Sequence, residues 1–430
     1  MGNLAITGGE VLRKTPFARW PEVDESDKKI IQEVVESGNW WMYAYNSDEL
    51  TLPDKGVSKV ESFEKAFKEM LHLKHALAVN SGTSALDICC RVVGIAPGDE
   101  VITTPYTFVA TTTCILNSYA LPVYVDIDPE TFTINPDLIE EAITKKTKAI
   151  IPVHFGGVLC DMDKIRNIAE KYNLKIIEDA AHVPSASLKG DRFAGGLGDI
   201  GIFSFQQSKI LIAGEGGIIT TNDDELAELV WSYRHVGRTK KGEWYEHSRL
   251  GWNYRMTEFQ GAILISQLAK LKGQNEKRNK NAAVLLKALK LIPGITTTSY
   301  HPETENYVYY LVCLRYNKNL WDGVHRDNVV KALNAEGIPV KVGYKYPLYK
   351  NTLFETIDFN SPFSPYRLGR DKPINSFANY AEKCPKAEQL CKEESIWLPH
   401  ELLLGTEKDI TDIVRAFEKV YENREELHEL

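Results

Sequence analysis

The 430-residue chain has no apolar run that approaches the roughly 18 residues needed to span a bilayer. Its N-terminus, MGNLAITGGEVLRKTPF, lacks a basic start followed by an apolar stretch, so we expect no secretory signal. Ile6 stands where the N-myristoylation pattern requires serine or threonine. We therefore expect a cytoplasmic protein with no membrane partner.

Cysteine is also scarce. The seven cysteines are scattered and odd in number, which is typical of free thiols in a reducing compartment rather than of a disulfide framework. No CxxC pair and no HExxH motif occurs, so neither a structural zinc site nor a zincin site is indicated. A metal cluster of Glu178, Asp179 and His182 is disfavoured because successive strand residues point to opposite faces. We expect no metal.

An excess of positive charge is missing as well. The 51 lysines and arginines against 59 aspartates and glutamates leave a net charge of −8. This balance disfavours nucleic acid and anionic membrane surfaces as partners. The hydrophobic fraction of 43% and the charged fraction of 26% are ordinary for a soluble globular protein. The length allows one large domain and one smaller domain.

Strand and helix patterns alternate in the first half of the chain. Such repeated βα units predict a mostly parallel sheet with helices on both faces, and ligands bind beyond the C-terminal ends of its strands. The expected strands are 75–79, 100–104, 121–126, 149–152, 175–179, 200–205 and 218–221, and the expected helices between them are 85–93, 105–116, 136–143 and 161–172.

Other helices flank this region, and a second unit follows it. Apolar spacing predicts helices at 27–37, 58–71, 224–236 and 257–271, the last continuing through the basic run 272–280. Beyond it we expect helices at 282–291, 326–336 and 408–424, strands at 307–315 and 338–342, and irregular structure at 344–385. We therefore place a large domain at residues 1–280 and a smaller α+β domain at residues 281–430.

A strand, a turn of small residues and a helix follow one another at residues 75–93. The turn, NSGTS at 80–84, leaves free N–H groups at a helix N-terminus, where an anion such as phosphate can bind. Ser81 or Thr83 could equally be an ordinary helix cap. The G-x-G-x-x-G match at 196–201 is not a dinucleotide fingerprint, because it precedes a strand rather than a helix.

Two charged residues stand where chemistry is expected. Asp179 ends a predicted strand, where a carboxylate could hold a cation or a protonated ring nitrogen, or could instead cap a following helix. Lys209 lies between two strands, close to Gly214, Gly216 and Gly217, which allow tight turns. A crowded, partly desolvated lysine loses proton affinity, as a Schiff-base lysine must. The alternative is an ordinary surface lysine in a loop.

The segment 39–53 is rich in aromatic residues, with Trp40, Trp41, Tyr43 and Tyr45. Its aromatic side chains could hold a surface loop together or form part of a substrate entrance. Both interpretations stay open.

Six motifs now stand in one order: SGTSAL (81–86), TF (107–108), EDAAH (178–182), FSFQQSK (203–209), GEGG (214–217) and LGWNYRMTEFQGAI (250–263). Together they resemble the DegT/DnrJ/EryC1/StrS family of pyridoxal-phosphate aminotransferases, over roughly residues 15–420. The resemblance implies a fold-type-I α/β transferase with pyridoxal 5'-phosphate as cofactor. Because Lys209 is present, variant dehydratases that carry histidine at this position are disfavoured.

The resemblance also implies roles for the reacting residues. Lys209 would form the internal aldimine, a Schiff base, with pyridoxal phosphate and would then shuttle protons. Asp179 would pair with the pyridinium nitrogen and make the ring an electron sink. His182 would lie near the phenolic oxygen of the ring, and Phe108 would stack on the ring face.

For the phosphate of the cofactor, the resemblance implies Gly82, Thr83 and Ser204 as ligands. Asn253 would reach the phosphate of a neighbouring subunit. We therefore expect a homodimer with shared active sites.

The substrates are indicated less sharply. Residues 206–208, Gln-Gln-Ser, replace the commoner His-Pro or Asn-Pro and are similar to scyllo-inosose aminotransferases and to 3-amino-5-hydroxybenzoate synthases. We expect ping-pong transfer from glutamate or glutamine to a keto-sugar or keto-cyclitol, in aminosugar or aminocyclitol antibiotic biosynthesis. The alternatives are a nucleotide-sugar aminotransferase, another pyridoxal-phosphate enzyme such as a dehydratase, or a non-catalytic binder. Candidates to bind the donor carboxylate are Arg255, Lys345 and Arg234.

Overall fold

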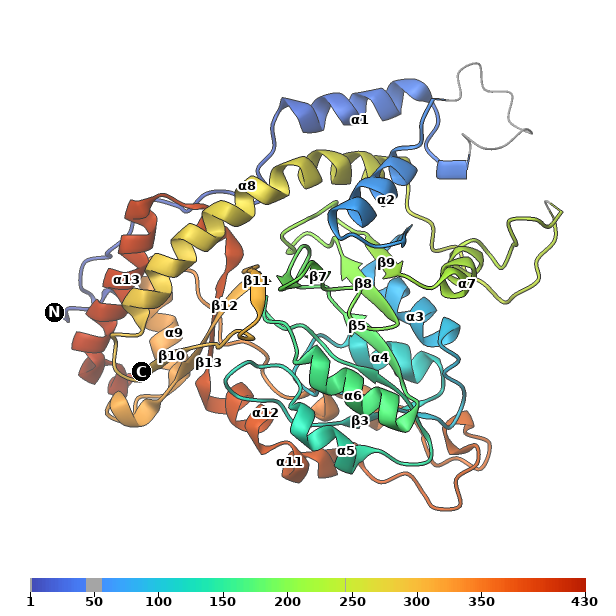
Figure 1. The fold of residues 1–430 in the computed structure, drawn as a ribbon. Coiled ribbons are helices and arrows are strands. Elements are labelled where there is room, and N and C mark those ends of the chain that lie inside the picture. Colours follow the sequence, from blue (N-terminus) through green and yellow to red (C-terminus); the bar gives the residue numbers. More distant parts are fainter. Residues whose placement is uncertain (1, 44–55, 244) are drawn as a thin grey trace.

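The computed structural model describes residues 2–43, 56–243 and 245–430. Its centre is the sheet that contains β3, β5, β8 and β9 (Figure 1). This sheet has seven strands in the order β1-β9-β8-β5-β4-β2-β3. Strand β9 runs antiparallel to both of its neighbours, and the pairs from β8 to β3 are parallel. The bounds are β1 His75–Val79, β2 Glu100–Thr103, β3 Leu121–Tyr124, β4 Thr147–Ile151, β5 Lys175–Asp179, β8 Ile200–Ser204 and β9 Gly217–Thr221.

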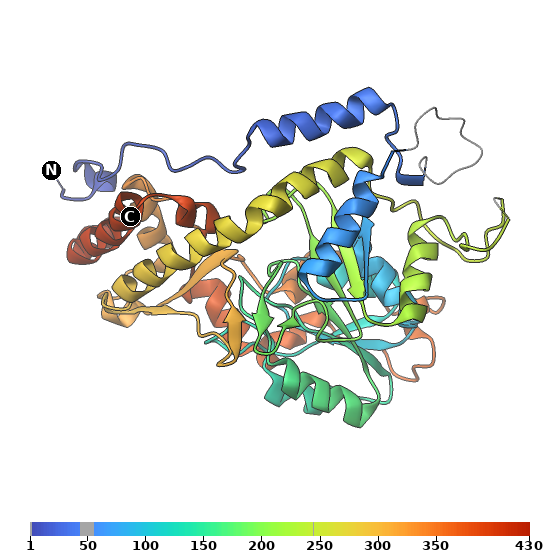
Figure 2. The ribbon, with the colours of Figure 1, turned by 45° about the horizontal axis from the view of Figure 1, so that its top comes forward.

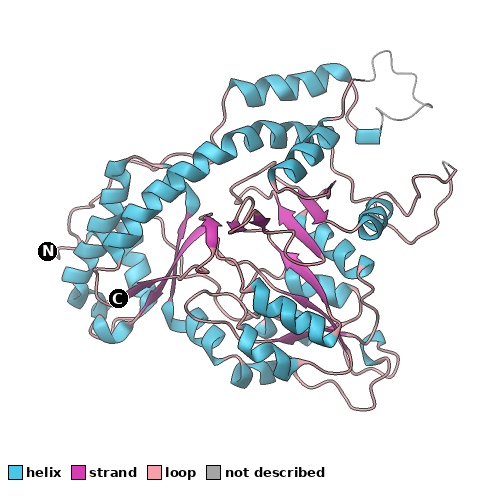
Figure 3. Ribbon diagram, viewed as in Figure 1, coloured by secondary structure: helices cyan, strands magenta, loops and turns pink. Residues whose placement is uncertain are grey.

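Helices cover both faces of this sheet (Figure 3). The strands are nearly continuous apolar runs because both of their faces are buried. Apolar residues of α2, α5, α6 and α8 pack on one face, and those of α3, α4 and α7 pack on the other. The bounds are α2 Lys59–Met70, α3 Gly82–Val92, α4 Ala110–Asn117, α5 Ile139–Ala142, α6 Met162–Tyr172, α7 Asp224–Arg234 and α8 Glu258–Leu289.

Helix α8 is a single helix of 32 residues, so the expected separation of two helices near residue 281 was wrong. Leu264 and Leu271 belong to the core against the large sheet, whereas Leu285 and Leu289 belong to the core of the C-terminal region. The helix continues because its basic run contains the buried residues Asn275 and Arg278, which hold it against its neighbours. The division into residues 1–280 and 281–430 falls within this helix and stays a prediction.

The C-terminal region has its own antiparallel sheet, β10-β12-β13. The core of this region also contains Leu4, and Arg13 donates to Asp412 at 2.9 Å. The first residues of the chain therefore pack against the C-terminal region. The helices of this region are α9 Arg326–Ala335, α10 Leu353–Thr356, α11 Tyr380–Lys383, α12 Pro385–Gln389 and α13 Glu407–Glu422, and the strands of its sheet are β10 Ile295–Thr297, β12 Leu311–Tyr316 and β13 Ser395–Pro399. A third sheet consists of β11 Thr304–Asn306, β6 Ser187–Leu188 and β7 Arg192–Phe193.

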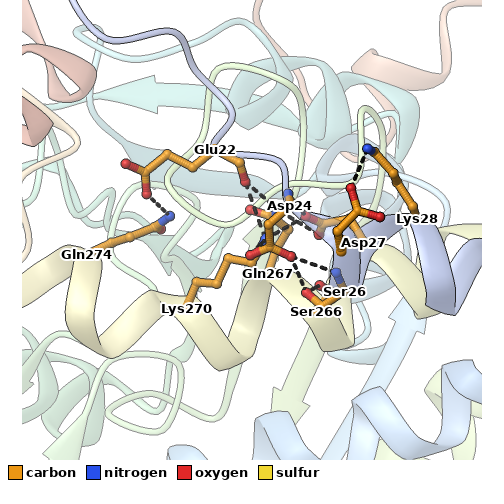
Figure 4. A network of polar contacts seen from close by, with 10 residues as sticks. Glu22, Asp24, Ser26, Asp27, Lys28, Ser266, Gln267, Lys270 and Gln274 are labelled. Atoms are coloured by element: carbon orange, nitrogen blue, oxygen red, sulfur yellow. Dashed lines mark hydrogen bonds and ion pairs between the residues drawn. The ribbon is translucent and has the colours of Figure 1, made fainter.

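Helix α1 (Glu25–Ser37) lies on the outside of α8 (Figure 2). Polar contacts join the start of α1 to α8 (Figure 4). Gln267 donates to Asp27 at 2.9 Å, and Asp27 also pairs with Lys270 at 2.5 Å. Asp27 is buried, so these partners offset the cost of removing its charge from water.

Several expected elements are shorter than the sequence suggests. Helix α4 begins at Ala110 rather than at residue 105, and the segment 338–342 contributes only an isolated bridge between Lys341 and Trp397 instead of a strand. Residues 136–143 form a 3₁₀ turn and a single α-helical turn. None of the helices in the described part of the chain combines the length and apolar character that crossing a bilayer takes.

Candidate active site

A cavity of about 530 Å³ lies where the C-terminal ends of β5 and β8 meet the N-terminus of α3. This is the edge of the sheet at which ligands of open α/β folds bind. Seven of the eight residues expected to hold a cofactor or react line it: Gly82, Thr83, Phe108, Asp179, His182, Ser204 and Lys209. The eighth, Asn253, is exposed on the segment after α7, paired with His235, and does not line this cavity.

Lys209 sits in the connection between β8 and β9, as the flanking strand patterns predict. Its Nζ lies 4.5 Å from the centroid of the Tyr310 ring. Among the described residues this Nζ has no hydrogen-bond or ion-pair partner. Burial lowers the pKa of Lys209 to about 8, although the negative charge of Asp179 acts in the opposite direction. Near neutral pH the neutral form of this amine, which acts as nucleophile and base, is therefore far more populated than in an ordinary lysine.

Asp179 ends β5 and is held in place by two donors. The Thr111 hydroxyl donates to its Oδ2 at 2.8 Å, and the backbone N–H of Ala181 donates to its Oδ1 at 3.3 Å. Burial raises the pKa of Asp179 above its ordinary value, and these hydrogen bonds act against that rise. The alternative that Asp179 caps a helix is wrong, because no helix follows it. The hydrogen bond from Ala181 belongs to a turn.

Glu178, the neighbour of Asp179, belongs to the other face of β5. It accepts the backbone N–H of Gly195 at 2.9 Å and contacts His154 at 3.1 Å, and it does not line the cavity. The alternation of faces expected from the sequence is therefore confirmed, and Glu178 and Asp179 do not face a common ligand.

The N-terminus of α3 is built for close approach. Ser81 accepts the N–H of Ser84 at 3.1 Å and so caps the helix, as one of the sequence alternatives proposed. Ser81, Gly82 and Thr83 all line the cavity. A Cβ on Gly82 would lie 2.8 Å from the Cβ of Ser204. Because only glycine fits there, the helix end and the strand end stay in contact and present their polar groups together.

His182 and Phe108 contribute two of the aromatic rings that line the cavity. His182 lies against Tyr310 with ring centroids 4.3 Å apart, and the N–H of Gly156 donates to its Nδ1 at 3.3 Å. Burial lowers the pKa of His182 well below its ordinary value, so the ring is neutral and carries its proton on Nε2. Phe108 is 58% exposed, which leaves a flat apolar face available to a ligand.

Sequence reasoning missed the residues that the C-terminal region contributes. Tyr310, Lys341, Tyr344 and Trp397 all line the cavity. Apolar periodicity marks 307–315 only as a strand, so no local signal shows that Tyr310 reaches the site. Thr111, the partner of Asp179, was missed because the helix there was expected to start at residue 105.

The three candidates for the donor carboxylate do not line the cavity. Arg234 is buried, forms an ion pair with Glu64 and donates to the Ala78 carbonyl at 2.7 Å, so it serves the fold. Arg255 donates to His235 at 2.9 Å, and Lys345 is exposed. Of the aromatic segment 39–53, Trp40 packs on Phe259, and the part from residue 44, including Tyr45, lies outside the described residues.

Behind the lysine, His400 holds the backbone of its loop. His400 is buried and its Nε2 donates to the Ser208 carbonyl at 3.2 Å. Its Nδ1 accepts from Arg278 of α8 at 3.3 Å, and the Trp20 ring packs edge-on at 4.7 Å between centroids. The residue before Lys209 is thus fixed by the N-terminal segment, α8 and the C-terminal region together.

A family model also matches the sequence. The model described as the DegT/DnrJ/EryC1/StrS aminotransferase family matches residues 44–418. The chain belongs to this family. As a DegT/DnrJ/EryC1/StrS aminotransferase, it combines the lysine, the strand-end aspartate and the helix N-terminus in one cavity.

Named relatives and solved structures cover nearly the whole length of this aminotransferase. A Streptomyces kanamyceticus protein provisionally named L-glutamine:3-amino-2,3-dideoxy-scyllo-inosose aminotransferase is 36% identical, with 99% of each chain covered. The L-glutamine:2-deoxy-scyllo-inosose aminotransferase of Micromonospora echinospora is 33% identical over 99% of this chain and 100% of the relative. The crystal structure of 3-amino-5-hydroxybenzoic acid synthase aligns with a TM-score of 0.82 at 28% identity, covering 96% and 100% of the two chains.

Proposed function

We propose that this aminotransferase uses pyridoxal 5'-phosphate to move an amino group from glutamine, or from glutamate, to a keto-cyclitol by a ping-pong mechanism. The observation that carries the proposal is the placement of Lys209, Asp179 and the N-terminus of α3 around one cavity. The names of the relatives support glutamine as donor and an inosose as acceptor.

The residues of the cavity fit this cofactor. The N–H groups at the start of α3, with Thr83 and Ser204, would hold the phosphate, and the close contact between Gly82 and Ser204 keeps these groups together. Asp179 would pair with the ring nitrogen. The exposed face of Phe108 would pack on the cofactor ring, and the neutral ring of His182 would lie near its phenolic oxygen.

When bound, pyridoxal phosphate supplies an electron sink that makes the proton on the donor α-carbon removable. Lys209 would hold the cofactor through Nζ in the resting enzyme. Once the donor amine has replaced it, its neutral Nζ would take the proton from the donor α-carbon and deliver it to the C4′ carbon of the cofactor, and it would carry a proton the opposite way in the second half-reaction. Asp179 would place a negative charge beside the ring nitrogen, and Thr111 fixes the direction of that carboxylate. His182 would offer its Nε2 proton to an oxygen of the bound molecule.

The dimer is part of the same proposal. Asn253 is exposed and does not line the cavity of its own chain, which suits a residue that completes the site of a second copy. We expect the phosphate site to gain this amide only in a homodimer.

A dehydratase is the second candidate, and the structural likeness to 3-amino-5-hydroxybenzoic acid synthase favours it over other classes. A nucleotide-sugar acceptor is the remaining alternative within amino transfer. The three reactions differ in what leaves the enzyme, so they can be separated directly.

Half-reaction screening tests the proposal. The enzyme loaded with pyridoxal phosphate is mixed with glutamine or glutamate while the absorbance of the cofactor and the release of keto acid are measured. The amine-loaded enzyme is then mixed with keto-cyclitols and nucleotide keto-sugars. We expect one amine product for each keto acid, with an inosose as the preferred acceptor. Loss of water without amine product would favour the dehydratase.

A further inference from the structure

The amino donor brings an α-carboxylate into the cavity, and a carboxylate taken out of water needs a positive partner. In the described part of the chain, two cationic side chains line the cavity, Lys209 and Lys341. Lys209 is committed to the cofactor and to proton transfer. The other charged residues of the lining, Asp179 and Glu215, are carboxylates and repel an anion. Lys341 is therefore the cation that the cavity's own chain leaves for the donor.

The backbone of Lys341 is held rigidly at the edge of the C-terminal sheet. Its N–H donates to the Trp397 carbonyl at 2.9 Å, and the Trp397 N–H donates to the Lys341 carbonyl at 2.8 Å. Residues paired across an antiparallel bridge project their side chains to the same face. Accordingly, Lys341 and Trp397 both line the cavity.

The ammonium group of Lys341 has no hydrogen-bond or ion-pair partner among the described residues, and the side chain is exposed. A lysine head offers three donors on a flexible stem, so it can meet a carboxylate without a fixed angle of approach. Lys345, four residues further on, is also exposed and unpaired within the described residues but does not line the cavity. The two lysines thus form a matched pair that differs in access to the site.

We propose that Lys341 binds the α-carboxylate of the amino donor and thereby selects an amino acid as the source of nitrogen. This assignment rests on the proposed function. The acceptor has no part in it, because a cyclitol ketone carries hydroxyl and carbonyl groups but no anion. A nucleotide-sugar acceptor would instead bring a diphosphate to the same ammonium.

Substitution of Lys341 separates these cases, because the two half-reactions of a ping-pong enzyme can be measured one at a time. We expect Lys341→Gln to lower kcat/KM for glutamine by about 10- to 100-fold, the size of a lost charge-assisted hydrogen bond. The value of kcat/KM for the keto-cyclitol should not change. Lys341→Arg should retain most of the glutamine activity, and Lys345→Gln should behave as wild type.

Two further measurements isolate the carboxylate. With 4-aminobutanamide, which is glutamine without its α-carboxylate, wild type and Lys341→Gln should react at the same low rate, so the two losses are not additive. The dissociation constant of 2-methylglutamine, which has no α-proton to lose, should rise about 10- to 100-fold in Lys341→Gln when measured by calorimetry.

Each result decides the assignment. An unchanged glutamine half-reaction in Lys341→Gln, beside a normal wild type, overturns the role of Lys341 alone. A fall confined to the acceptor half-reaction overturns it in favour of an anionic acceptor. A wild type that converts neither glutamine nor glutamate overturns the proposed function, and the assignment of Lys341 fails with it.

Discussion

The two walls of the cavity come from different parts of the chain. The sheet wall consists of Gly82, Thr83, Asp179, Ser204 and Lys209, which stand at strand ends, at a helix N-terminus or in the β8–β9 connection. The C-terminal wall consists of Tyr310, Lys341, Tyr344 and Trp397 and belongs largely to irregular or edge segments. We propose a division of labour that follows this difference, in which the sheet wall would hold the cofactor and the C-terminal wall would distinguish the substrates.

The largest expected effect comes from removing the amine of the sheet wall. Lys209→Ala should slow both half-reactions by about 10⁴-fold, because the attachment point of the cofactor and the proton carrier are lost together. Borohydride treatment followed by peptide mass spectrometry should find the cofactor fixed to Lys209 in wild type and at no lysine in the variant. A cofactor fixed at another lysine would contradict the assignment of cofactor binding to the sheet wall. Lys345→Ala is the control.

Asp179→Asn should slow both half-reactions by about 10²- to 10³-fold, because a neutral amide cannot balance a protonated ring nitrogen. Thr111→Val is the graded version, with a fall of about 3- to 10-fold for one lost hydrogen bond. Stopped-flow absorbance with each substrate checks both variants. A change confined to one half-reaction would contradict the place of these residues in the cofactor wall.

Proton affinity gives the next effect, which is measured on the cofactor-free protein. Because the pKa of Lys209 is lowered to about 8, its reaction with acetic anhydride should reach a plateau above that pH and fall tenfold for each unit below it. Asp179→Asn should move the midpoint to lower pH, since the charge of Asp179 raises the pKa of Lys209. Mass spectrometry of the Lys209 peptide gives the profile. A midpoint near the ordinary 10.5 would show that burial does not tune this amine.

Tyr310 gives the smallest effect and lies where the walls meet. Tyr310→Leu removes the ring 4.5 Å from the Lys209 Nζ, and we expect both half-reactions to change by about 2- to 5-fold, the size of a cation–π contact. Tyr310→Phe keeps the ring and should stay close to wild type, although the 3.1 Å contact of its hydroxyl with Ser208 is lost. Steady-state kinetics with each substrate measures the change. An effect on the acceptor alone would assign the ring to substrate selection.

The same division explains what the sequence could predict. Strand ends and helix N-termini follow general rules of parallel sheets, so Asp179, Gly82 and Thr83 could be located from patterns around them. Tyr310 and Lys341 could not, because they reach the cavity only through the packing of the C-terminal region against the sheet. The sequence does not show which basic residues are free to bind the donor carboxylate, since Arg234 has its charge paired with Glu64 inside the fold. The extent of α8 was missed because its buried polar residues do not follow an apolar period.

His400 has a consequence for the order in which the protein becomes competent. The carbonyl that precedes the reactive lysine is bound by a residue encoded 192 positions later, and that residue packs against Trp20 near the start of the chain. During synthesis, Lys209 therefore leaves the ribosome long before its loop can be fastened. A chain that lacks Trp20 or His400 loses a part of this anchor, so the nascent polypeptide acquires the complete surroundings of Lys209 only after His400 has been synthesised.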